Sequence, residues 1–293
     1  MAQTTFDSTE TQTQRTFWSV FFRSGFLTFV YILLILLAIS MIFPYIWMLA
    51  NSFKTRTAFF TDPYSIIPQA MTLNTYQEAL TIGRMSLYLM NSALYTITVL
   101  VAQLFINSLA AYSFARVEFP GRDTLFLAVL ATLMLPGSVT LIPTFLIAHA
   151  LGLTNTFMGV VLPGFVSAFG IFLLRQFFLN IPRELEDAAR IDGSGFFGTY
   201  WRIMLPLAQP AMITLGVFTF LGEWNSFIWP LIVLSDSDKY PVTVGIALFR
   251  DFNTINWPNV FAASTIVSLP VVILFIVAQN SIVGGISLSG LKG

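Results

Sequence analysis

The sequence predicts an all-α polytopic membrane protein with six transmembrane helices. Of its 293 residues, 56% are hydrophobic and only 10% are charged, whereas an average soluble domain carries about a quarter charged residues. The mean hydropathy is +0.78. Six apolar stretches reach the length of roughly 20 residues that a helix needs to cross a bilayer. Six such stretches leave too little polar sequence to cover a soluble core.

Composition also excludes several kinds of protein. The chain has no cysteine, which excludes disulfides and thiolate metal sites, and its one histidine, His149, excludes a multi-histidine metal site. Lys plus Arg and Asp plus Glu both total 14. This balance is not that of a basic nucleic-acid-binding protein.

The segments follow in order along the chain. Residues 1–25 form a polar tail that ends in aromatic residues next to the first span. The apolar run that follows is too long for a signal peptide, so we interpret this run as a membrane anchor. Residues 51–86 form an outer loop and residues 283–293 a second tail. Each span can satisfy its own backbone hydrogen bonds as a helix in lipid. The expected spans are 26–50, 90–115, 124–147, 157–179, 207–234 and 261–282.

Two features indicate how the spans pack. Ser108, Ala111 and Ala115 form a stripe of small residues on the second span, which is typical of close helix packing. Prolines interrupt four of the later spans and are expected to kink them. These are Pro136, Pro143, Pro163, Pro230 and Pro270.

The distribution of Lys and Arg between the loops predicts the orientation. With both termini inside, nine of these residues fall on the inner side and five on the outer side. The sequence therefore favours a multi-pass membrane protein with both termini in the cytoplasm.

Glu223 is the only acidic residue well inside a predicted span. With Trp224 and Asn225 it could line a cavity for a sugar, since aromatic, amide and carboxylate groups suit such a solute. The alternative is an interfacial aromatic belt with a carboxylate that reaches water. The sequence leaves both interpretations open.

The chain contains no nucleotide-binding motif. A literal Gly-x-Gly-x-x-Gly occurs at residues 193–198, but no strand precedes it, so it is a chance match. We therefore expect no cofactor, no catalysis and no ATP hydrolysis by this chain alone.

The loop at residues 181–206 predicts a short amphipathic helix. Glu184, Glu186 and Asp187 lie at its N-terminal end, where the helix dipole favours negative charge. Arg190 is expected to pair with Glu186 at i,i+4, and Gly193 is expected to cap the C-terminus. Such a helix could dock into a partner or rest on the bilayer. We refer to residues 181–206 as the docking loop.

This loop resembles the motif of ABC importer permeases: Glu-Ala-Ala, three residues, Gly, nine residues, then Ile-x-Leu-Pro. Here the motif is Asp187-Ala188-Ala189, Gly193 and Ile203-Met204-Leu205-Pro206, with every spacing kept and Asp in place of Glu. Further segments resemble the second permease of maltose-type carbohydrate importers. They include SFK at 52–54, AAYSFAR at 110–116, FGIFLLRQFF at 169–178 and WNSFIWPL at 224–231.

The resemblance implies the type I importer fold in the plasma (inner) membrane, with residues 87–282 as the permease core. It implies a second homologous permease, two ATPase subunits that bind ATP-Mg, an extracytoplasmic solute-binding protein and a carbohydrate substrate. It also implies that the loop helix couples to the ATPases, with Ala188 and Ala189 against their groove. The implied coupling residues are Glu186, Asp187, Ala188, Ala189, Arg190, Gly193, Ile203, Leu205 and Pro206.

Two other functions remain as alternatives. An ion-coupled secondary transporter usually places carboxylates near the middle of the membrane, and this chain offers little besides Glu223. A structural membrane scaffold would not explain the kinked spans or the docking loop.

Overall fold

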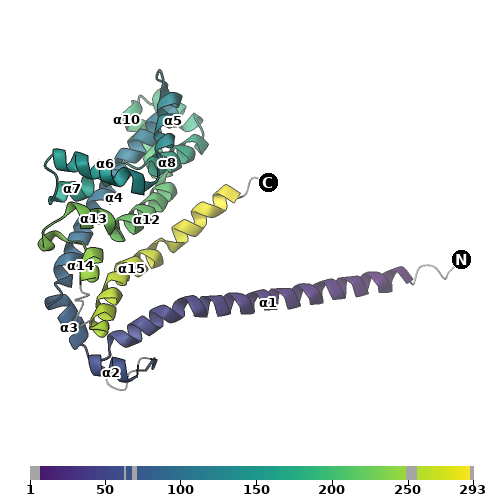
Figure 1. The fold of residues 1–293 in the computed structure, drawn as a ribbon. Helices are drawn as coiled ribbons and strands as arrows, with labels where there is room; N and C mark the ends of the chain where they lie inside the picture. The colour runs from purple at the N-terminus through teal and green to yellow at the C-terminus, as the bar shows by residue number, and fades with distance from the viewer. Residues whose placement is uncertain (1–6, 63, 68–70, 249–255, 291–293) are drawn as a thin grey trace. The chain divides into compact units, whose positions relative to one another are not determined.

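The computed structural model describes residues 7–62, 64–67, 71–248 and 256–290, and these residues contain helices and turns but no strand. The chain divides into two compact units, Met1–Thr72 and Leu73–Gly293, which are described separately (Figure 1). The first unit contains α1 (Asp7–Ser52) and α2 (Arg56–Thr61). The helix α1 begins at Asp7, so most of the segment expected to be a tail is helical.

The second unit contains the remaining elements. They are α3 (Asn74–Thr81), α4 (Met85–Arg116), α5 (Arg122–Thr132), α6 (Gly137–Ala150), α7 (Phe157–Val161), the 3₁₀ turn η1 (Leu162–Gly164), α8 (Ala168–Asn180), α9 (Glu184–Ile191), α10 (Phe196–Thr199), the π-helical η2 (Tyr200–Met204), α11 (Leu205–Leu207), α12 (Gln209–Trp224), α13 (Ile228–Val233), the 3₁₀ turn η3 (Ser237–Lys239), α14 (Val242–Leu248) and α15 (Trp257–Gly290).

Six membrane crossings are compatible with these helices. In the described part of the chain, three helices are long and apolar enough to cross singly: Phe26–Ser52, Met85–Arg116 and Trp257–Gln279. Three further crossings require two helices each, joined by a bend. The pairs are Arg122–Thr132 with Gly137–Ala150 (101°), Phe157–Gly164 with Ala168–Asn180 (40°) and Phe196–Leu207 with Gln209–Trp224 (76°).

Prolines explain two of the helix ends. A proline ring clashes with the carbonyl four residues earlier in a continuous helix, and α5 ends at Thr132, four residues before Pro136. The interruption expected from Pro230 in the span 207–234 is present, because α12 ends at Trp224 and α13 begins at Ile228 with Pro230 near its start. In contrast, Pro143 and Pro270 lie inside α6 and α15, which continue past them.

The helix α4 is the central helix of the second unit. It packs along α8 and α12, and Figure 1 shows it running from α3 and α14 at one end to α5 and α10 at the other. The expected small-residue stripe lies in this packing, since Ser108 and Ala111 are fully buried and Ala115 is 2% exposed. Ala111 and Ala115 share a core cluster with Leu174, Phe178 and Leu215.

Polar contacts fasten the other end of α4 to the segment before α14. Asn91 Nδ2 donates to the carbonyls of Asp238 and Tyr240 at 2.8 and 3.0 Å. Tyr95 donates its hydroxyl to the carbonyl of Lys239 at 2.8 Å. The two ends of α4 therefore each hold a different loop in place.

We expect overpacking of the stripe to destabilise the fold. Ala111→Leu adds volume where α4 meets α8, at a cost of about 1–3 kcal/mol, and the midpoint of thermal unfolding in detergent should fall. Ala131→Leu on α5 is the control, because Ala131 is exposed. Equal midpoints for the two variants would contradict the close packing of α4 on α8.

Candidate functional site

The docking loop contains a capped helix, as expected. The helix α9 carries three acids in its first turn and Arg190 in its last turn. After it, the amide of Gly193 donates to the carbonyl of Arg190 at 3.0 Å, and that of Ser194 donates to Ala189 at 2.8 Å. This is the Schellman pattern, and it requires a left-handed residue at Gly193, whose φ is +82°. The prediction of Gly193 as the C-terminal cap is confirmed.

The two alanines of the loop motif lie on different faces of α9. Ala189 is 5% exposed and faces the interior together with Glu186. Ala188 is exposed, as are Leu185 at 42% and Ile191 at 87%. Successive helical residues are rotated by about 100°, which turns Ala189 toward its own chain and leaves Ala188 facing outward. The expectation that Ala189 lies against a partner groove is therefore wrong. The outward row consists of Leu185, Ala188 and Ile191.

Glu186 pairs with Arg116 and not with Arg190 as expected. Arg116 Nε lies 2.8 Å from Glu186 Oε1, and the two side chains are 4% and 6% exposed. The Nε–H does not point at the oxygen, so the contact is an ion pair without a linear hydrogen bond. Arg190 instead lies 4.0 Å from Asp187 on the helix surface. Removing one partner of a buried pair costs about 3–5 kcal/mol, far more than an exposed pair contributes.

Two arginines also join the end of α4 to α8. Arg116 Nη2 donates to the carbonyl of Phe178 at 2.7 Å and to that of Ile181. Arg175 on α8 donates to the carbonyl of Phe114 at 3.2 Å. The sequence placed Arg116 on the inner side and in the AAYSFAR segment but did not reveal its partner. An arginine that closes an apolar span was the available signal.

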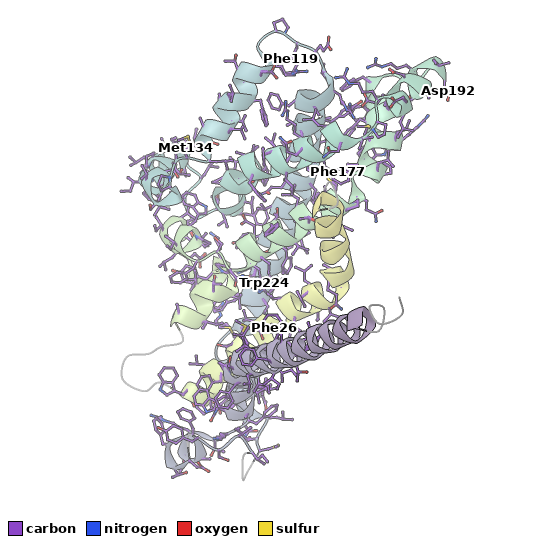
Figure 2. All side chains as sticks on the ribbon, turned by 90° about the vertical axis from the view of Figure 1, so that its right-hand side faces the viewer. Phe26, Phe119, Met134, Phe177, Asp192 and Trp224 are labelled. Carbon is purple, nitrogen blue, oxygen red and sulfur yellow. The ribbon has the colours of Figure 1, made fainter. Side chains whose placement is uncertain are left out.

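The remaining loop residues extend from α10 to α11. The hydroxyls of Tyr200 in η2 and Ser108 in α4 lie 2.8 Å apart and are both buried, which joins the loop to the membrane helix. Of the expected coupling residues here, Ile203 and Leu205 are half-buried and Pro206 is exposed. Figure 2 shows Asp192 and Phe119 at the same end of the second unit, with Trp224 farther along it. The docking loop and the Arg116 end of α4 therefore share one end.

The three expected cavity residues do not converge. Trp224 is 4% exposed, donates to the carbonyl of Val267 at 3.1 Å and stacks on Phe220. Its indole is therefore part of the core. Asn225 is exposed and donates to the carbonyl of Leu221 at 2.8 Å, where α12 ends. Only Glu223 is half-buried, and its carboxylate makes no hydrogen bond or ion pair to the described residues.

A polar network surrounds the break between η1 and α8. Gln103 on α4 donates to the carbonyl of Gly164 at 2.7 Å and accepts from Thr219 of α12 at 2.8 Å. Asn107 accepts from the amide of Ser167 at 3.2 Å. Glu223 Oε1 lies 3.1 Å from where a Cβ would stand at Gly164. Side chains of α4 thus satisfy the backbone groups freed by the break, as a membrane interior requires.

Known proteins match most of the chain. Residues 103–287 match the family described as binding-protein-dependent transport system inner membrane component. The arabinooligosaccharides transport system permease AraQ of Halalkalibacterium halodurans is 34% identical over 88% of this chain and 93% of its own length. The trehalose/maltose permease MalG of Thermococcus litoralis is 33% identical over 88% and 94%.

Two further matches agree with these. The diacetylchitobiose permease NgcG of Streptomyces coelicolor is 33% identical over 87% of this chain and 85% of its own. A crystal structure of a bacterial ABC transporter that imports the acidic polysaccharide alginate matches with a TM-score of 0.81 and 25% identity, over 88% of this chain and 96% of that one. The chain therefore belongs to the binding-protein-dependent inner membrane components, the permease subunits of ABC importers.

Proposed function

We propose that this permease forms half of the translocation pathway of an ATP-driven importer for oligosaccharides. The proposed coupling to ATPase subunits is supported above all by the outward row Leu185, Ala188 and Ile191. This row lies on a capped helix whose opposite face is bound to α4. An exposed apolar row beside charged residues fits a groove in a partner protein. The relatives named for arabinooligosaccharides, diacetylchitobiose and trehalose or maltose support the substrate class.

The importer would contain four kinds of component. This chain would pair with a second, homologous permease. Two ATP-binding cassette subunits would bind ATP-Mg and dock on the end of the permease pair that carries α9. A solute-binding protein would deliver the oligosaccharide from outside. The chain itself would be non-catalytic and would hold no cofactor. The lack of a phosphate-binding loop in the sequence supports this division of work.

The end with α9 would face the cytoplasm, together with both termini. Five arginines lie in or beside this end, and positive residues favour the cytoplasmic side. They are Arg116, Arg175, Arg183, Arg190 and Arg202. The tails themselves include residues 1–6 and 291–293, which lie outside the described residues. An ion-coupled mechanism is not proposed, because it would give the docking loop no role.

Introduced cysteines test the orientation in this cysteine-free chain. An impermeant thiol reagent added to intact cells should label Thr72→Cys and leave Ser194→Cys unlabelled. Both should be labelled after the membrane is permeabilised. Labelling of Ser194→Cys alone in intact cells would reverse the topology.

Substitutions in the docking helix test the coupling role. Gly193→Val forces a β-branched residue to positive φ, at a cost of about 1–2 kcal/mol, and Ala188→Trp enlarges the outward row. Both should keep the partner permease and lose co-purified ATPase or oligosaccharide-stimulated hydrolysis in proteoliposomes. Gly193→Asn is the matched control, since Asn tolerates this conformation. Normal uptake by both test variants would show that α9 is not the coupling element.

Glu223 is the remaining candidate for contact with solute. A buried polar contact contributes about 0.5–1.5 kcal/mol, so Glu223→Ala should raise the KM several-fold for maltose, trehalose or arabinotriose, whichever the wild type takes up. Asn225→Ala serves as the comparison, because its amide already bonds Leu221. If neither KM changes, Glu223 has no part in recognition.

A further inference from the structure

We infer that Arg116 and Glu186 form a clamp that makes α9 move together with α4 and α8, so that they are positioning residues for coupling. The inference rests on the proposed docking of α9 to an ATPase. It adds a distinct step, namely how a displacement of the docking helix reaches the membrane helices. The clamp lies on the face of α9 opposite the outward row and touches neither nucleotide nor solute.

One guanidinium holds three segments of the chain. Arg116 closes α4, pairs with Glu186 of α9 at 2.8 Å, and donates to the carbonyls of Phe178 in α8 and Ile181 just beyond it. The planar guanidinium fork has fixed donor directions. These directed bonds to Phe178 and Ile181 hold the guanidinium between α4 and the end of α8. A shift of α9 would separate the buried carboxylate of Glu186 from that fixed charge, so the three segments are expected to move as one.

Little else in the described residues ties α9 to the membrane helices. Its closely packed helical neighbour is α10, the next element of the same loop. The other ion pairs of the described residues are more exposed, and those in the docking loop and the α4–α5 turn lie within one element. These are Arg190–Asp187 inside α9 and Arg122–Asp123 at the start of α5. Tyr200 bonds Ser108 farther along the loop, but the buried pair is the main polar link between α9 itself and the membrane helices.

The chemistry of the pair suits a mechanical link. Both charges are removed from water, and a buried charge without its partner is strongly disfavoured. Separation of α9 from α4 would leave two such charges. Apolar contacts would hold the same surfaces together but would permit sliding, because dispersion has little directionality.

Spin labels report the clamp directly. Nitroxides at Gln176→Cys on α8 and Glu184→Cys on α9, both exposed positions outside the outward row, should give one narrow distance distribution in the purified complex, with or without ATP-Mg and vanadate. With Glu186→Gln or Arg116→Met added, the distribution should widen at least twofold. Asp123→Asn is the matched control, because it breaks the exposed pair at the same end.

Transport separates positioning from simple destabilisation. In proteoliposomes, Glu186→Gln should retain co-purified ATPase and hydrolysis but carry at least fivefold less maltose, trehalose or arabinotriose per ATP. A purely structural residue would lower assembly, hydrolysis and uptake together and leave that ratio unchanged. Arg116→Lys keeps the positive charge but lacks the guanidinium fork. Its ratio of sugar carried to ATP hydrolysed should lie between those of wild type and Arg116→Met.

The outcomes distinguish the clamp from the proposed function. If no ATPase co-purifies with the wild-type permease, the proposed function fails. The widths of the spin-label distance distributions still test the clamp in that case. If single variants do not assemble, the double variant Arg116→Met/Glu186→Gln removes both buried charges and is measured instead. A narrow distribution and a wild-type ratio in any assembled clamp variant would overturn the inference.

Discussion

The fold depends on one constraint: inside a membrane, every backbone group of a broken helix must find a partner within the protein. The helix α4 meets this need for its neighbours. Its Gln103 and Asn107 bind the backbone where the fourth crossing breaks, between Gly164 and Ser167. Its small residues bring α8 close enough for these contacts. An unbroken helix thus permits broken ones beside it.

The same helix connects the two ends of the second unit. At one end, Arg116 binds the docking helix and the end of α8. At the other, Asn91 and Tyr95 hold the segment around Lys239. A helix of 32 residues cannot bend sharply without a local cause. We therefore expect a displacement of α9 to tilt α4 as a rigid body and so to move the segment around Lys239.

Local rules predicted much of this arrangement from the sequence. The Gly193 cap and the small stripe on α4 depend on residues a few positions apart, and both are present. The helix breaks were harder, because a proline removes one hydrogen bond and only neighbouring segments decide whether the helix continues. Pro136 lies just before α6 and Pro230 near the start of α13, each next to a break, whereas Pro270 lies within the continuous α15.

Long-range pairing could not be predicted in the same way. Glu186 has Arg190 at the favoured helical spacing, yet its partner is Arg116, far away in the sequence. An exposed i,i+4 pair contributes a few tenths of a kcal/mol, whereas an unpaired buried carboxylate costs several. Burial therefore decides the partner, and burial follows from tertiary structure. Since Glu186 turns inward, Ala189 turns inward beside it, and Ala188 is left facing out. The motif therefore spans two faces of α9: one is packed against its own chain, and the other, which carries Ala188, is exposed.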